Sequence, residues 1–278
     1  MNSKFFLVLC LFILLFNIAL GAAELLQAAH LPEPERSRPY RIGVGFGYSF
    51  TGYREETVLD INRYLNTFTF IIDANIKKGR FFHSLNFGIF RGENDPIVAY
   101  PADLFTFRPD PFRQYFEFYQ NKYIFTRVYF EYVLGYRLWG NQRFPGYLGG
   151  ALRADYYGIS SLSNIMYLNF SALVSLGLHV SQKWFINQNN TLVFSVTLPI
   201  FGYALRPSFV GFLAYPLEHR IISLHNYWAV FGNLKYHYRI TPLLSFYSGV
   251  AVEFSHIDFP RPRRDVKTRL SAGIAFTF

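Results

Sequence analysis

The sequence predicts an all-β fold, a single antiparallel transmembrane β-barrel of about ten strands. Three observations predict it. From Tyr40 onward, apolar residues recur at every second position, which is the period of a strand with two different faces. The segments are longer than the roughly five or six residues of a soluble strand, and strands that cross a bilayer need about 9–11. Short and long connections alternate along the chain, which is typical of transmembrane barrels.

The segment before the barrel has the pattern of a secretory signal peptide over residues 1–21. Lys4 precedes an apolar stretch, and the small residues Ala19 and Gly21 stand where a cleavage site is expected. Residues 22–39 contain three prolines among mixed charges, so we expect a periplasmic N-terminal tail there. The single cysteine, Cys10, lies in the leader, which excludes disulfides and thiolate metal ligands from the expected mature chain.

The barrel over residues 40–278 begins with a strand that carries Gly43, Gly45 and Gly47 at alternate positions. We expect these glycines to face inward and to leave room for large side chains opposite. The alternation continues through nine more segments and excludes a parallel sheet covered by helices, whose buried strands are continuous apolar runs. Eight or twelve strands are the alternatives. The expected strands are 40–50, 65–77, 80–91, 122–139, 146–157, 167–185, 191–203, 226–240, 243–256 and 266–278.

The connections divide into two sets. The first hairpin turns at Lys78-Gly79, where glycine supplies the positive φ of a two-residue turn. We expect the short turns on the periplasmic side, together with both ends of the barrel, and the longer loops on the extracellular side. The other short turns are 140–145, 186–190 and 241–242, and the long loops are 51–64, 92–121, 158–166, 204–225 and 257–265.

Composition excludes several classes of protein. The chain is 20% aromatic and 16% charged, whereas disordered chains are poor in aromatic residues. Past the leader, no apolar run approaches the roughly 20 residues of a membrane-spanning helix. The net charge of +9 is spread along the chain, so nucleic-acid binding is not expected. The one dense basic cluster, at residues 261–264, is interpreted as a solvated loop or, alternatively, as a contact with anionic head groups.

The last nine residues, Leu270 to Phe278, alternate apolar and small side chains and end on Phe276 and Phe278. This ending resembles the terminal strand of Gram-negative outer-membrane proteins, and the general resemblance covers residues 40–278. It implies a bacterial outer-membrane location, contact with lipid and lipopolysaccharide, and recognition of the C-terminal strand by the barrel-assembly machinery.

The alternation places many charged side chains inside the barrel. If Trp139 and Gly146 flank a turn, Glu131 lies opposite Arg153 or Asp155. An analogous register on the last hairpin would set Glu253 opposite Arg269. Such charges either form an ion-pair network that plugs the lumen or line a narrow pore that disfavours cations. The expected network is Arg127, Glu131, Arg153, Asp155, Lys235, His237, Glu253, Lys267 and Arg269, with Asp73, His179 and Lys183 also inward.

No residue is predicted to be catalytic, to bind a cofactor or to bind a metal. His256 and Asp258 share a face near the outer rim, but the alternation places His256 on the lipid side, where an interfacial histidine is the favoured interpretation. His179 and His237 would need to meet across the lumen, near Glu131, to hold a metal. The aromatic loop 92–121 either binds a ligand or folds into the barrel mouth as a lid.

The sequence therefore predicts an integral outer-membrane β-barrel that is not an enzyme. It would be a narrow channel, or a plugged barrel whose extracellular loops bind a ligand or partner. The alternative is an outer-membrane hydrolase of lipid or peptide with a site at the extracellular rim.

Overall fold

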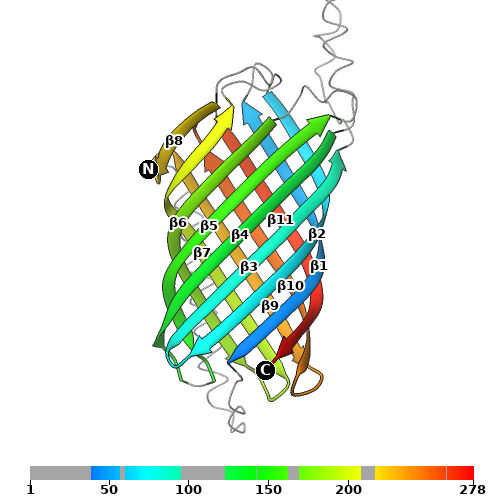
Figure 1. The fold of residues 1–278 in the computed structure, drawn as a ribbon, viewed down its shortest axis with the longest axis vertical. Coiled ribbons are helices and arrows are strands. Elements are labelled where there is room, and N and C mark those ends of the chain that lie inside the picture. The colour runs from blue at the N-terminus through cyan, green and yellow to red at the C-terminus, as the bar shows by residue number, and fades with distance from the viewer. Residues whose placement is uncertain are drawn as a thin grey trace, which may run out of the picture.

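The computed structural model describes residues 39–56, 60–94, 123–141, 143–161, 169–207, 217–260 and 262–278. They form one antiparallel sheet that closes into a tilted barrel (Figure 1). The strands are β1 (Tyr40–Glu56), β2 (Asp60–Lys78), β3 (Phe81–Asn94), β4 (Tyr123–Trp139), β5 (Gly146–Ser161), β6 (Asn169–Phe185), β7 (Asn190–Pro207), β8 (Leu217–Ser223), β9 (Tyr227–Arg239), β10 (Leu244–Ile257) and β11 (Arg263–Thr277). None of the described residues forms a helix that is long and apolar enough to cross a membrane.

The ring has ten places for its strands. β1 pairs with both β2 and β11, and the pairing of β6 with β7 completes the closure. β8 and β9 share one place, because both pair with β7: Ser223 lies opposite Phe201, and Phe231 lies opposite Thr197. The prediction of a closed, ten-stranded barrel is confirmed. β8 is a correction, since the sequence predicted only a loop over 204–225.

The short connections lie at the end of the barrel that also holds the start of β1 and the end of β11 (Figure 1). Gly79 has φ +60°, as predicted, but its two-residue turn is formed with Arg80, one residue later than the expected Lys78-Gly79. Gly140 has φ +80° and begins the turn that separates Trp139 from Gly146. In the convention of outer-membrane barrels this is the periplasmic end; we call it the lower end.

Several strands extend further at the upper end than the sequence predicted. β1 continues to Glu56 and β2 begins at Asp60, so most of the expected loop 51–64 is strand. β11 begins at Arg263, so Arg263 and Arg264 lie in a strand rather than in a solvated loop. Above the membrane, the strands remain hydrogen-bonded to their neighbours, but lipid no longer imposes apolar residues at alternate positions. The alternation in the sequence therefore ends before the strand does, and it underestimates the length of the strand. The expected signal peptide and tail (1–38) and residues 95–121 of the aromatic loop lie outside the described residues.

The outer surface of the barrel is apolar. Phe46 and Phe68, on neighbouring strands, are 70% and 74% exposed, and Leu176 and Leu270 are about half exposed elsewhere on the ring. A water-soluble protein rarely exposes apolar area on this scale. An apolar band outside and polar groups inside are the arrangement of a barrel in lipid.

The inner face of β1 carries glycines at alternate positions, as expected. A β-carbon at Gly43 would lie 2.5 Å from the Asp73 carboxylate, and one at Gly45 would overlap the hydroxyl oxygen of Tyr247. These glycines therefore make room for the large polar side chains of the neighbouring wall, and the close approach brings charged groups together inside the lumen.

Candidate functional site: the charged lumen

Arg127 of β4 and Glu253 of β10 form an ion pair across the lumen. Arg127 Nη1 donates to Glu253 Oε2 over 2.7 Å, and Arg127 Nε donates to Asp155 Oδ1 over 2.8 Å. β4 and β10 are five places apart in either direction around the ring, so this contact joins opposite walls. Arg127 is only 1% exposed.

Arg153 of β5 lies beside Arg127 and shares its carboxylates. Its Nε donates to Asp155 Oδ2 over 2.6 Å, and its Nη2 donates to Glu253 Oε2 over 3.3 Å. Its Nη1 lies 3.7 Å from Glu131, which is its direct cross-strand partner in the register. Removal of two guanidinium groups from water is costly, and these shared carboxylates offset that cost.

Aromatic rings enclose the cations of this cluster. The guanidinium carbon of Arg153 lies 3.8 Å from the Phe231 ring centre, and Lys267 Nζ lies 3.0 Å from that of Phe90. Arg269 Nη1 donates to the hydroxyl of Tyr129 over 3.0 Å. Ammonium and guanidinium groups over aromatic faces gain cation–π attraction where water is excluded. We call Phe90, Arg127, Arg153, Asp155, Phe231 and Glu253 the upper plug.

Two apolar clusters pack against the upper plug. The first contains Leu65, Phe90, Phe125 and Tyr129. The second contains Ala204, Ile222, Tyr227, Ala229, Phe231, Ile257 and Phe259. Both share a ring with the upper plug, Phe90 in the first and Phe231 in the second. Ion pairs and aromatic rings therefore lie together at the level of the upper plug.

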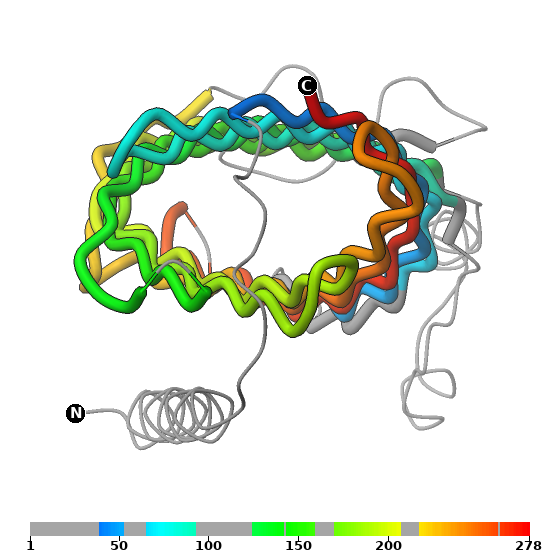
Figure 2. The backbone as a smooth tube through the Cα atoms, turned by 90° about the horizontal axis from the view of Figure 1, so that it is seen from below, coloured from blue at the N-terminus to red at the C-terminus, as the bar shows by residue number. Residues whose placement is uncertain are grey.

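The lower half of the lumen is a cavity of about 540 Å³, which we call the lower chamber. Its lining extends from the turn residues Asn187 and Thr241 up to Arg153 and Glu253 of the upper plug. Seen from the turn side, the strands form an oval ring (Figure 2). Because its lining includes residues of the short turns at 187–189 and 241–242, the chamber reaches the periplasmic end of the barrel.

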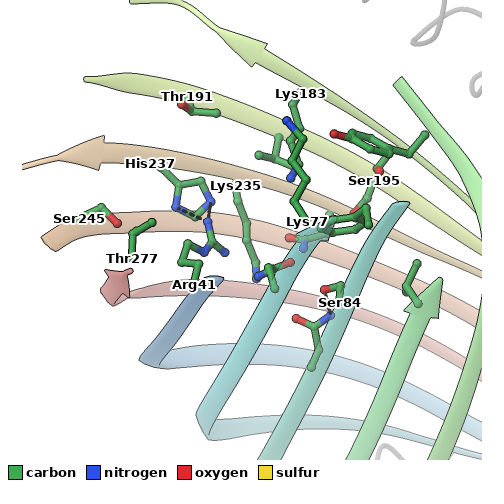
Figure 3. Close-up of a pocket in the computed structure, with 18 of the residues that line it drawn as sticks. Arg41, Lys77, Ser84, Lys183, Thr191, Ser195, Lys235, His237, Ser245 and Thr277 are labelled. Atoms are coloured by element: carbon green, nitrogen blue, oxygen red, sulfur yellow. Dashed lines mark hydrogen bonds between the residues drawn. The ribbon is translucent and has the colours of Figure 1, made fainter. Parts of the chain in front are cut away.

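Cations dominate the wall of the lower chamber. Figure 3 shows Arg41, Lys77, Lys183, Lys235 and His237 around the same space. Arg41 Nη2 lies 2.6 Å from Asp73 Oδ1, and Lys235 Nζ lies 3.9 Å from Asp73 Oδ2. A second amino group of Arg41, Nη1, lies 3.0 Å from Nε2 of His237. The lower chamber thus has a positively charged surface with Asp73 beside it.

Arg41 was missed in the sequence analysis, although it has the same strand parity as the inward Gly43 and Gly45. The register of the last hairpin is also a correction. Glu253 lies opposite Lys267, not Arg269, because β11 begins three residues before the expected strand and the connection is correspondingly shorter.

The two inward histidines have separate partners. His179 Nδ1 lies 2.9 Å from Thr197 Oγ1, and that hydroxyl donates to Glu131 over 3.0 Å. His237 instead contacts Arg41. Among the residues that the structure describes, no group of three or more histidine, cysteine or carboxylate side chains has the arrangement of a metal site.

His256 and Asp258 form a pair on the outer face, with Nε2 2.7 Å from Oδ1. His256 lies opposite Trp228 in the register, and the centres of their rings are 5.8 Å apart. It shares the strand parity of the exposed Val250 and Phe254, so it faces away from the lumen. The pair lies outside the charged lumen.

Comparison with known proteins supports the architecture. Neither a protein family nor a curated protein matches the chain by sequence. The solved structure of the outer membrane protease OmpT from Escherichia coli has a TM-score of 0.55 and 8% identity, over 91% of this chain and 100% of that chain. The translocator domain of the autotransporter NalP from Neisseria meningitidis has a TM-score of 0.47 and 10% identity, over 94% and 96%.

At 8% identity, the likeness to OmpT shows the fold alone. The surface chemistry adds an independent argument, since apolar side chains cover the outside of the ring and charged ones line its inside. Because a closed barrel of this polarity is stable only where lipid surrounds it, the chain is an outer-membrane β-barrel protein of the Gram-negative type.

Proposed function

We propose that this protein is a non-enzymatic barrel of the outer membrane that conducts no ions. It binds a ligand or partner and does not form a continuous pore. The observation that carries the proposal is the 2.7 Å contact between Arg127 and Glu253, which stand on opposite walls. An ion pair at this distance leaves no water-filled path between its two groups.

The size of the barrel supports the same conclusion. A ring of about eight strands is just wide enough for side chains to fill, whereas porins of 16–18 strands leave an aqueous channel. A ring with ten strand places is close to the size that side chains can fill. The upper plug and its two apolar clusters use guanidinium groups and aromatic rings, the bulkiest side chains available, to fill that space.

Single-channel recording of the refolded protein in a planar bilayer tests the proposal. We expect a silent membrane in the presence of demonstrably folded protein. Reproducible conductance steps from the unaltered protein would show an aqueous path and would contradict the plugged barrel. A matched recording with a known porin, refolded in the same way, shows that the assay detects an inserted open barrel.

The proposal assigns ligand or partner binding to the extracellular loops, and contacts with lipid and lipopolysaccharide to the apolar outer face. It assigns recognition by the barrel-assembly machinery to β11. Phe276 and Phe278 support that assignment, because both are about half exposed on the outer face at the end of the chain.

A rim hydrolase is the second candidate, and the His256–Asp258 pair is the observation that favours it. A histidine held by a carboxylate can act as a general base toward water. Lipid and peptide hydrolysis by purified protein, compared with His256→Ala and Asp258→Asn, separates the two functions. Activity that both substitutions abolish would support the hydrolase, whereas absence of hydrolysis in all three proteins would support the non-enzymatic barrel.

A further inference from the structure

The lower chamber contains more positive charge than its own carboxylates balance. Arg41, Lys183 and Lys235 approach it from three different strands, and Asp73 is the carboxylate that contacts two of them. Glu131 and Glu253 also border the chamber, but they pair with the arginines of the upper plug. Lys77 lies on the same wall, so the four basic side chains and Asp73 leave an excess of about three formal positive charges in the lower part of the chamber.

Lys183 is the clearest sign of this imbalance. Its Nζ lies 4.3 Å from the Phe82 ring centre and 5.5 Å from that of Tyr147. The charges that act on it are those of Arg41 and Lys77, both positive. Within the described part of the chain, no carboxylate pairs with it. Lys183 is half-buried, and an ammonium group held partly out of water without a counter-charge is costly, so an anion in the adjoining cavity would offset that cost.

The remaining lining also suits a polar ligand. Ser84, Thr191 and Ser195 add hydroxyl-bearing side chains to the lining of the same cavity (Figure 3). Phe82 and Phe185 add apolar wall next to Lys183. The volume of about 540 Å³ lies within the range of about 300–1,000 Å³ that is usual for small-molecule pockets.

We infer that the lower chamber binds a small phosphate-type anion, which enters from the periplasmic end. A phosphate monoester carries a charge of about −1.5 to −2 at neutral pH, which offsets most of the excess of the chamber. Lysine ammonium groups bind phosphate as point charges, and the Arg41 guanidinium adds directed donors. Inorganic phosphate and the phosphate group of an organic ester share this chemistry, and the aromatic wall favours the ester.

Isothermal titration of the detergent-refolded protein in a phosphate-free buffer of low salt tests the site. The probes are inorganic phosphate, glucose 6-phosphate and, as an uncharged control, glucose. We expect saturable binding of one phosphate-bearing molecule and none of glucose. Lys183→Met and Lys235→Met should each weaken binding at least tenfold, because each removes a charge that faces the ligand.

Lys78→Met is the matched control, since Lys78 is exposed at the same end of the barrel outside the chamber. It should bind as the unaltered protein does. Lys183→Arg should retain most of the affinity, because it keeps the charge. Circular dichroism and the shift in gel mobility on boiling show whether each variant is folded.

Each outcome decides a separate point. Absence of saturable binding of both phosphate probes, or equal affinity in folded Lys183→Met, would overturn the inference. Tighter binding of glucose 6-phosphate would identify an organic ester as the ligand class, and equal affinities would identify the phosphate group alone. None of these results depends on conductance, so the plugged barrel and the anion site fail or stand separately.

Discussion

The guanidinium of Arg127 and the carboxylate of Glu253 lie 2.7 Å apart, although 126 residues and half the circumference of the barrel separate them. Arg127 is also bonded to Asp155, so one side chain balances two carboxylates from different strands. The contact fixes the distance between opposite walls in the upper half of the lumen.

Arg127→Met should destabilise the barrel strongly, because it leaves Asp155 and Glu253 with too little positive charge in a buried place. Breaking a buried pair by removing one partner costs about 3–5 kcal/mol. Urea unfolding in lipid vesicles, followed by tryptophan fluorescence, measures this loss. Arg264→Met on the exposed side of β11 should change stability by less than about 0.5 kcal/mol. Equal effects of the two substitutions would show that the cross-lumen pair contributes nothing specific.

Removal of the upper plug should open the barrel. A triple substitution of Phe90, Arg127 and Arg153 by alanine takes away the bulkiest groups at that level, so we expect conductance steps where the unaltered protein is silent. Alanine at Lys77, Lys183 and Lys235 enlarges only the lower chamber and should leave the bilayer silent. Conductance steps from this second triple variant would show that the barrier lies in the lower half of the lumen and not at the upper plug.

Gly45→Ala should reduce the yield of folded barrel, since its β-carbon would overlap the Tyr247 hydroxyl and lie 2.8 Å from the Ala272 carbonyl oxygen. Gly232→Ala is the matched control. A β-carbon there meets only the Val252 carbonyl oxygen, at 3.7 Å, which is an ordinary contact. The folded fraction after refolding, read from gel mobility, should fall for the first variant and not for the second.

A charge on the outer face should cost more at mid-depth than at the rim. Leu270→Arg places a guanidinium near the middle of β11, where lipid-facing arginine costs about 2–4 kcal/mol. Ile240→Arg lies in the turn after β9 and should cost at most about 1 kcal/mol. Unfolding free energies in vesicles measure both, and a reversed order would contradict the assignment of β11 to the membrane.

Removal of Phe278 should slow assembly in cells more than it lowers stability. Phe278 stacks on Tyr40, with ring centres 6.0 Å apart on the outer face at the lower end, so little buried area is lost with it. Pulse-chase accumulation of folded barrel in the outer membrane measures assembly, and urea unfolding of refolded protein measures stability. A large loss of stability with normal assembly would remove the role proposed for the C-terminal residues.

Most strands of the barrel wall could be predicted from the sequence. One face of each strand contacts lipid and the other packs inside the lumen, so residue types alternate along the strand with a period of two. The turn between Trp139 and Gly146 is short, so the sequence limits the partner of Glu131 to Arg153 or Asp155. A register shift between Arg137 and Trp139 makes that partner Arg153. The register predicted for the last hairpin was wrong because the length of its connection was overestimated. The error placed Glu253 opposite Arg269, two residues away from its actual partner Lys267.

Contacts across the lumen could not be predicted in this way. Alternation assigns Arg127 and Glu253 to the inside, but only the number of strands and the curvature of the ring determine that they meet. β8 was hidden for another reason. Its burial pattern does not alternate, and its place is set by the upper half of β7, whose residues 201–207 pair with it.

The upper half of the lumen holds the upper plug and the lower half holds the lower chamber, so the two ends of the barrel are not equivalent. If the upper plug closes the lumen as proposed, a molecule outside the cell has no route to Lys183 through it and reaches it only after crossing the outer membrane elsewhere. On this proposal the lysine-lined space samples the solutes of the envelope and not those of the surroundings. An inhibitor aimed at it would have to be delivered to the periplasm first.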